Sequence, residues 1–236
     1  MQGLFRQPAN TVSNLGFVGA GLLIAQHSAT THWATERGVT SRGRGGFPLG
    51  LAAAYALMVV ALGPASAAMH ATQSAVGGDL DLTSMFLVSS FALAYATSRL
   101  LRRRDAYAVA RVFLVALFAQ EIAYFRGGRL PWIEHSGNLA FAVTILATVV
   151  IEVMIERQPR RAGDPDPLAR GWLVAALGCL LIALVVWSLS KTGGVWCDPA
   201  SLIQGHAVWH VLCAGAAYAL YRAYAGGERD GSRRRQ

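Results

Sequence analysis

The sequence predicts an all-α polytopic membrane protein, a seven-transmembrane helix bundle. Of its 236 residues, 54% are hydrophobic and 14% are charged, and long uncharged stretches recur along the chain. Each stretch has the roughly 17–25 residues that a helix needs to cross the hydrocarbon core. Lipid offers no hydrogen bonds to exposed backbone, so a helical bundle is expected rather than an open sheet. The expected spans are residues 11–27, 51–72, 82–100, 106–125, 137–156, 171–190 and 203–224.

The first span, residues 11–27, is expected to stay in the membrane as a helix rather than to be removed as a signal peptide. It lacks a basic N-terminal region, and polar residues stand among its first positions. Asn10, Ser13 and Asn14 share one helix face at the i, i+3 and i+4 spacing. That face favours hydrogen bonds to neighbouring helices. A place in the outer shell of a site is the weaker alternative for these three residues.

The connections between the later spans differ in length and composition. Residues 28–50, rich in Gly and Arg, and residues 157–170, which contain three prolines, are expected to be solvated connectors. ATQSAVGGDL, after the second span, and TGGVWCDPAS, before the seventh, are the loops that lead into the expected site. No repeat or soluble domain is visible. Residues 1–236 are therefore expected to form one membrane domain with a basic disordered tail at 226–236.

The net charge of +8 is distributed unevenly. Sixteen of the 21 basic residues lie in the first, third and fifth loops and in the tail, whereas the alternate side holds only Arg6, Arg126, Arg129 and Lys191. By the positive-inside rule, the N-terminus is expected outside and the C-terminus in the cytoplasm. Nucleic-acid binding is not expected, because such tails usually fix topology. The excess of arginine over lysine, with abundant alanine, indicates a bacterial inner-membrane protein.

Three histidines are expected at one depth, in the outer-leaflet half of the bundle. His70 stands near the end of the second span, and His206 and His210 stand at the start of the last. On a helix, residues four apart share a face, with Cβ atoms about 5–6 Å apart. Polar side chains are costly in lipid, so an intramembrane histidine cluster indicates a functional site. Three imidazoles and a water are the ligand set of a catalytic zinc. No Glu follows the first histidine, so a general base must come from elsewhere.

Ser66 and Asp81 are expected beside these histidines. Ser66 precedes His70 by four residues, and Asp81 is expected to open the third span one short loop after it. Simpler interpretations exist for each residue alone. Asp caps helices well, Ser in a helix often bonds its own backbone, and a lone buried His is usually a hydrogen-bonded core residue. Their agreement in depth favours a single site.

Other polar residues near the outer ends of the spans are assigned weaker roles. Glu121 is a candidate for the outer shell of the site, although pairing with Arg126 or Arg129 is favoured. Gln204, just before the last span, is a second candidate for that shell. Trp209 is a candidate for lining an acyl pocket, with simple packing as the alternative.

The remaining histidines fit the site less well. His27 and His32 are expected on the cytoplasmic side, and His135 in an outer loop. A retinal-binding proton pump, suggested by seven helices, needs a lysine in the last helix. The only lysine, Lys191, lies outside that helix, so the pump is excluded. A zinc transporter would need ionisable residues along a whole path, whereas here they gather in one leaflet.

Three sequence blocks resemble the alkaline ceramidases, and through them the seven-helix membrane hydrolases that include the adiponectin receptors. PANTVSNLGF (8–17) is similar to the family's NTxSNL opening of the first helix. SAAMHATQSAVGGDLDLTSM (66–85) has the family's S-x3-H, then an Asp at a spacing that selects Asp81 over Asp79. CDPASLIQGHAVWHVL (197–212) is similar to the family's Cys, Gln and H-A-x-W-H-[IV]-L. The three blocks occur in the same order as in the family, and together the resemblance covers nearly the whole chain.

The resemblance implies zinc held by His70, His206 and His210, with Ser66 and Asp81 as catalytic residues. It implies hydrolysis of ceramide, or of a related N-acyl lipid in the membrane, to a fatty acid and a sphingoid amine. Asp81 would take a proton from the attacking water and pass it to the leaving amine. The Ser66 hydroxyl would stabilise the oxyanion.

One feature of the family is not matched. Alkaline ceramidases carry an acidic motif before the first helix and a Glu three residues before the Asn of NTxSN, which together form a calcium site. Gln7 stands at the position of that Glu, and no acidic motif precedes it. Calcium binding is therefore not expected, unless the natural start lies upstream.

A zinc-containing lipid-binding or sensory membrane protein of the same superfamily is the alternative to an enzyme. A structural zinc usually has four protein ligands and no open position. Only three strong ligand candidates line up here, which favours catalysis. No pattern in the sequence predicts an oligomeric state.

Overall fold

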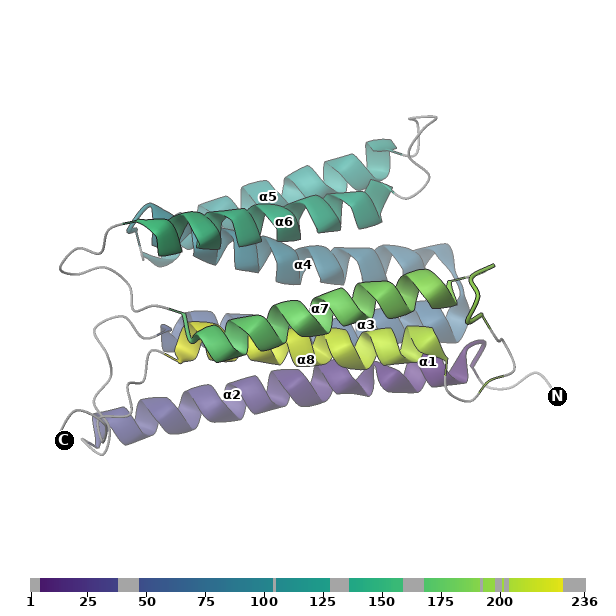
Figure 1. The fold of residues 1–236 in the computed structure, drawn as a ribbon, viewed down its shortest axis with the longest axis horizontal. Coiled ribbons are helices and arrows are strands. Elements are labelled where there is room, and N and C mark those ends of the chain that lie inside the picture. The colour runs from purple at the N-terminus through teal and green to yellow at the C-terminus, as the bar shows by residue number, and fades with distance from the viewer. Residues whose placement is uncertain are drawn as a thin grey trace.

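The computed structural model of the protein describes residues 5–37, 47–103, 105–127, 136–158, 168–191, 193–197, 201 and 204–226. These residues form seven long helices and one short helix, with no strand among them (Figure 1). The helices, in chain order, are α1 (Pro8–Ser13), α2 (Leu15–Glu36), α3 (Leu49–Thr72), α4 (Ala75–Leu100), α5 (Ala106–Gly127), α6 (Ser136–Arg157), α7 (Arg170–Ser190) and α8 (Gly205–Ala225).

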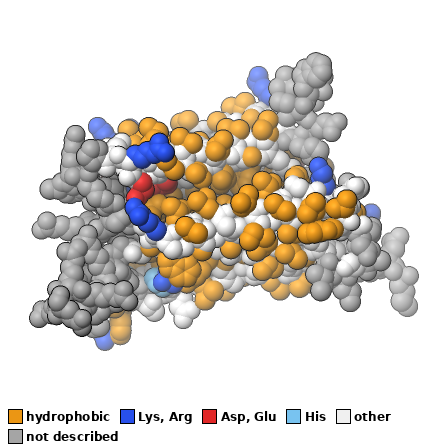
Figure 2. Space-filling view, viewed as in Figure 1, with side chains coloured by type: hydrophobic (Ala, Val, Ile, Leu, Met, Phe, Trp, Pro, Cys, Tyr) orange, Lys and Arg blue, Asp and Glu red, His pale blue; other side chains and the backbone are white. Residues whose placement is uncertain are grey.

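The predicted all-α membrane architecture is confirmed. Helices α3 to α7 are each long and apolar enough to cross a membrane, judged by length and composition. Helices α2 and α8 have similar lengths, 22 and 21 residues, but carry more polar side chains, including two of the site histidines in α8. Apolar side chains cover the middle of the bundle, and Lys and Arg gather toward its ends (Figure 2). The protein is an integral membrane protein.

Helix α4 connects two parts of the bundle (Figure 1). It packs against α3 on one side and against both α5 and α6 on the other. Helix α8 packs against α7 and α2, and α2 packs against α3. The short helix α1 contacts α3 and α8, close to the C-terminus of α3 and the N-terminus of α8. That end of the bundle is called the α1 end below.

The helices differ in extent from two of the predicted spans, and the first of these, residues 11–27, is divided at Asn14 between α1 and α2. The connector predicted at 28–50 is shorter, because α2 continues to Glu36 and α3 begins at Leu49. Helix α4 begins at Ala75 instead of residue 82, because the Ser74 side chain accepts a hydrogen bond from the Gly77 N–H, at 3.1 Å, and caps the helix. The other spans agree with the prediction to within two residues at each end. Most of the predicted tail, from residue 227, lies outside the described residues.

The turn between α3 and α4 contains only Gln73 and Ser74. Gln73 adopts a left-handed backbone conformation, with φ of 53°, and its N–H donates to the Met69 carbonyl at 2.7 Å. A Cβ atom on Gly77 would lie 2.8 Å from the Cα and 3.0 Å from the N of Met69. Backbone atoms cannot turn aside as a side-chain tip can, so glycine is what permits this approach. The first turns of α4 therefore lie directly beside the end of α3 that carries His70.

An aromatic cluster fills the opposite end of the bundle. Phe47, just before α3, is 5% exposed and lies in ring contact with Phe91, Tyr95, Tyr221 and Tyr224. Aromatic side chains bury large apolar areas and pack edge to face, as most of these rings do. The two ends of the bundle therefore differ in chemistry, with buried aromatic rings at one end and polar side chains at the α1 end.

Candidate functional site

The three predicted histidine ligands meet at the α1 end. His70 comes from the last turns of α3, and His206 and His210 from the first turns of α8. Ring centroids are 4.7 to 4.9 Å apart in all three pairs. One ring nitrogen from each histidine lies within 4.8 Å of the others. The i, i+4 spacing on α8 and the turn at the end of α3 thus build one compact cluster that could hold a metal ion.

The side chain of Gln7 determines which nitrogen of His70 is free. Nδ1 of His70 lies 2.6 Å from Oε1 of Gln7. An amide oxygen only accepts, so Nδ1 carries the proton and Nε2 keeps its lone pair. Nε2 is buried and has no hydrogen-bond partner in the described part of the chain. A buried polar atom without a partner costs free energy. A metal ion shared with the other two histidines would satisfy it, so the residues fit such an ion.

Ser13 contacts the Nδ1 atom of His210 in the way that Gln7 contacts the Nδ1 atom of His70. Its Oγ lies 2.8 Å from Nδ1 of His210 and donates its hydrogen to the Asn10 carbonyl at 2.9 Å. The Ser13 oxygen therefore accepts from His210, which leaves Nε2 of that ring to bind a ligand. Ser13, predicted as an interhelical or outer-shell residue, contacts a site histidine directly.

Asn10 and Asn14 support this arrangement from within their own segment. The Asn10 Nδ2 donates to Gln7 Oε1 at 3.1 Å, and the Asn14 Nδ2 donates to the Asn10 carbonyl at 2.8 Å. Both asparagines are buried, 5% and 1% exposed. The interhelical hydrogen bonds predicted for this face are thus formed by Ser13, whereas the side-chain amides of the two asparagines bond locally.

The start of the chain is attached to the site by its backbone as well. The N–H of Arg6 donates to the Ala71 carbonyl and that of Gln7 to the His70 carbonyl, each at 3.1 Å. Pro8 then begins α1, a position where its missing N–H costs nothing. Sequence reasoning missed Gln7 as a partner of a site histidine. Its position in the sequence could have indicated this role, because Gln7 stands just before Pro8 and three residues before Asn10. Alkaline ceramidases have an acidic side chain at that position.

Ser66 and Asp81 lie together beside the cluster. Ser66 stands one turn before His70 on α3 and is 2% exposed. Its side chain faces the half-buried carboxylate of Asp81 on α4, close enough for the hydroxyl to interact with that carboxylate. The expectation that Asp81 opens or caps its helix is wrong, because Ser74 caps α4 and Asp81 lies beyond its first turn. The longer α4 still brings Asp81 to Ser66, because Gly77 allows the two helices to approach closely.

Asp79, which the family spacing excludes, has a different partner. Its Oδ1 accepts a hydrogen bond from the Tyr124 hydroxyl at 2.7 Å, which joins α4 to α5. Glu121, one turn before Tyr124, forms no ion pair with Arg126 among the described residues. The other partner predicted for Glu121, Arg129, lies outside those residues.

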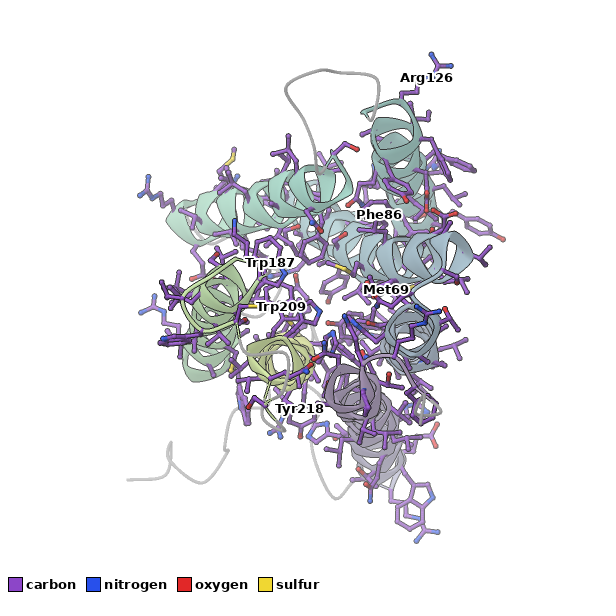
Figure 3. All side chains as sticks on the ribbon, turned by 90° about the vertical axis from the view of Figure 1, so that its right-hand side faces the viewer. Met69, Phe86, Arg126, Trp187, Trp209 and Tyr218 are labelled. Carbon is purple, nitrogen blue, oxygen red and sulfur yellow. The ribbon has the colours of Figure 1, made fainter. Side chains whose placement is uncertain are left out.

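Trp209 and Gln204 flank the histidines on the α8 side. The ring of Trp209 packs against that of Trp187 from α7, with centroids 6.0 Å apart (Figure 3). Gln204 is the N-cap residue of α8, and its carbonyl accepts from the N–H of Ala207 at 2.9 Å. The Gln204 side chain makes no capping hydrogen bond to α8.

The histidines expected away from the site have other contacts. His27 lies 2.9 Å from the Tyr221 hydroxyl, and His32 lies 3.1 Å from Glu36 on the next turn of α2. His135 falls outside the described residues.

The comparison with protein families shows the family to which the chain belongs. A family model described as Ceramidase matches residues 7–228. The chain belongs to the ceramidase family. The matched region begins at Gln7 and includes every residue of the site. A search of curated proteins found no match to this chain. Family membership and the histidine cluster together make it a ceramidase-like membrane hydrolase with side chains suited to a metal ion.

Proposed function

We propose that this ceramidase is a zinc-dependent intramembrane amide hydrolase that cleaves ceramide or a related N-acyl lipid to a fatty acid and a sphingoid amine. The observation that carries the proposal is the position of the Ser66–Asp81 pair. Ser66 lies one helical turn before His70, with Asp81 beside it. His70 belongs to the cluster of three histidines, and its Nε2 is buried without a hydrogen-bond partner among the described residues. A carboxylate that transfers a proton, a hydroxyl that stabilises an oxyanion and a metal with an open position can together hydrolyse an amide.

His70, His206 and His210 would hold the zinc ion. Three protein ligands leave a fourth position open, as in catalytic rather than structural zinc sites. Zinc bound there supplies a Lewis acid that polarises the scissile carbonyl and activates water.

Asp81 and Ser66 carry out the proton transfer and the charge stabilisation. Asp81 takes one proton from the attacking water and later gives a proton to the leaving amine nitrogen, so that the carboxylate is regenerated. Before the reaction, the Ser66 hydroxyl interacts with the Asp81 carboxylate. Once Asp81 is protonated it accepts less strongly, and the same hydroxyl then donates to the oxyanion that forms on the substrate carbonyl.

The substrate reaches the site from the membrane. The site lies at the α1 end, among helices whose outer faces are apolar (Figure 2). The arginine distribution supports placing this end in the outer leaflet of a bacterial inner membrane. Trp209, paired with Trp187, is proposed to line the acyl chain, with Glu121 and Gln204 further from the reacting atoms.

Purified protein and a fluorescent ceramide test the proposal. Wild-type protein in detergent is assayed for fatty-acid release and for zinc content, beside His210→Ala and Asp81→Asn. His32→Ala serves as the matched control, because that histidine pairs with Glu36. We expect turnover and one zinc in the wild type and the control, loss of both in His210→Ala, and loss of turnover alone in Asp81→Asn. Stoichiometric zinc without hydrolysis of any N-acyl lipid would instead indicate a lipid-binding protein, and a zinc-free wild type would contradict the metal assignment.

A further inference from the structure

We propose that Gln7 is a positioning residue of the site: its amide oxygen holds His70 in the tautomer and orientation that present Nε2 to the metal. Ser13 does the same for His210. This inference rests on the proposed zinc site and adds to it residues 7–13, α1 and its N-cap residue, which orient two of the three proposed ligands.

The contact between Gln7 and His70 is made at two points. The Gln7 N–H donates to the His70 carbonyl at 3.1 Å, and its side-chain oxygen accepts from the His70 ring at 2.6 Å. The backbone contact fixes where α1 lies against the end of α3. The side-chain contact fixes the rotation of the ring, because an imidazole N–H must point at its acceptor.

Asn10 determines which way the Gln7 amide faces. Its Nδ2 donates to the same oxygen, Oε1 of Gln7, at 3.1 Å. If the amide were reversed, its NH₂ group would face the NH₂ group of Asn10, and two donors would oppose each other. Gln7 therefore presents its oxygen to both neighbours, and the proton on His70 Nδ1 follows from that orientation.

The same asparagine orients the second histidine through its backbone. The Asn10 carbonyl accepts the hydroxyl hydrogen of Ser13 at 2.9 Å, which leaves the Ser13 oxygen to accept from His210 at 2.8 Å. One residue of α1 thus sets the direction of both hydrogen bonds to the histidines. Asn10 is 5% exposed, so water does not compete strongly for these groups.

Partners of this kind change metal affinity. Residues that hydrogen-bond the non-ligating nitrogen of a metal-binding histidine fix its tautomer and raise its basicity, and their loss typically weakens metal binding by about 10–100-fold. Gln7 supplies a neutral amide oxygen for this purpose, and a carboxylate at the same position would also accept from His70 and Asn10.

Zinc affinity of side-chain variants tests the inference. Gln7→Met keeps the length of the side chain but has no amide oxygen, Gln7→Glu keeps an acceptor, and Gln26→Met on the exposed face of α2 is the matched control. Zinc dissociation constants are measured by chelator competition on the full-length protein in detergent. We expect about 10–100-fold weaker binding in Gln7→Met, and wild-type or tighter binding in Gln7→Glu and Gln26→Met. Cobalt replacing zinc should show altered visible absorption only in Gln7→Met.

The outcomes separate this inference from the proposed hydrolase. Wild-type zinc affinity and an unchanged cobalt spectrum in Gln7→Met would overturn the positioning role while leaving hydrolysis intact. Equal weakening in Gln7→Met and Gln7→Glu would also overturn it, because a general packing defect would then explain both. Ser13→Ala tests the His210 side independently and is expected to weaken zinc binding in the same range. A wild type that binds zinc but hydrolyses no lipid would contradict the proposed function and leave the role of Gln7 standing.

Discussion

Arg99 and Glu152 form a buried ion pair between α4 and α6, at the end of the bundle opposite α1. The Arg99 Nη1 donates to the Glu152 Oε2, and the two residues are 4% and 5% exposed. The count of basic residues assigns Arg99 to the third loop. The structure instead directs its side chain into the bundle. Charged groups inside a membrane protein are costly unless paired, so each member of this pair depends on the other.

Breaking this pair should destabilise the protein without changing the chemistry at the α1 end. Glu152→Gln leaves the Arg99 charge buried and uncompensated, which typically costs about 3–5 kcal/mol. The thermal unfolding temperature in detergent is expected to fall clearly, while zinc content at low temperature stays at the wild-type level. The double variant Arg99→Met/Glu152→Leu removes both charges and should recover much of the loss. A double variant as unstable as Glu152→Gln would contradict this explanation.

The close contact between α3 and α4 should be essential for catalysis but not for metal binding. In Gly77→Ala, the added Cβ would meet the Met69 backbone at 2.8 Å, so α4 must move away and carry Asp81 from Ser66. We expect hydrolysis to fall by on the order of 100-fold, the contribution of a general base. Zinc binding should remain, because no proposed ligand lies on α4.

Gly78→Ala provides the control for this prediction. A Cβ on Gly78 has no atom within 4 Å, and the substitution should raise helix propensity without strain. The rate of hydrolysis and the zinc content are measured for both variants, and only Gly77→Ala is expected to lose activity. Equal activity in the two variants would show that the separation of α3 and α4 does not control Asp81.

The two neighbouring aspartates of α4 should differ sharply in function. Asp81→Asn removes the proton acceptor and is expected to lower kcat by about 100–10,000-fold, with zinc content unchanged. Asp79→Asn keeps an oxygen that accepts from the Tyr124 hydroxyl and should stay within a few-fold of the wild type. Steady-state kinetics on ceramide vesicles would measure both. A larger loss in Asp79→Asn would reverse the assignment.

Removal of zinc should abolish activity, and calcium should neither restore nor stimulate it. The Gln7 oxygen already accepts hydrogen bonds from His70 and Asn10, and an amide carries no charge to attract a divalent cation. Protein treated with a zinc chelator is expected to recover activity with added zinc alone. Assays with calcium or with a calcium-selective chelator should leave the rate of the zinc-loaded protein unchanged. Activation by calcium would contradict this prediction and would show that calcium binds elsewhere in the protein.

The parts of the site that could be predicted from sequence are those fixed by local helix geometry. His206 and His210, and likewise Ser66 and His70, stand four residues apart, a spacing that places two side chains on one helix face wherever the helix lies. The arginine count then predicted that the two helices bring these faces to the same depth. The histidine cluster follows from these two regularities.

The parts that sequence reasoning missed depend on tertiary contacts. The close packing of α4 against the end of α3 depends on Gly77 lying beside the Met69 backbone, which no periodic pattern reveals. Gln7 is joined to His70 across 63 positions of sequence, and its role follows only once α1 is placed against α3. Arg99 was misplaced for a similar reason, since its partner Glu152 lies on a helix two spans further along the chain.

The hydrogen bond between Ser13 and His210 joins residues 197 positions apart, so almost the whole chain must be made before it can form. At a synthesis rate of about 5–20 residues per second, the first helix waits on the order of 10–40 s for the last. During that interval its buried polar groups lack their final partners within the membrane. The proposed metal site can therefore be completed only after the last helix has joined the first.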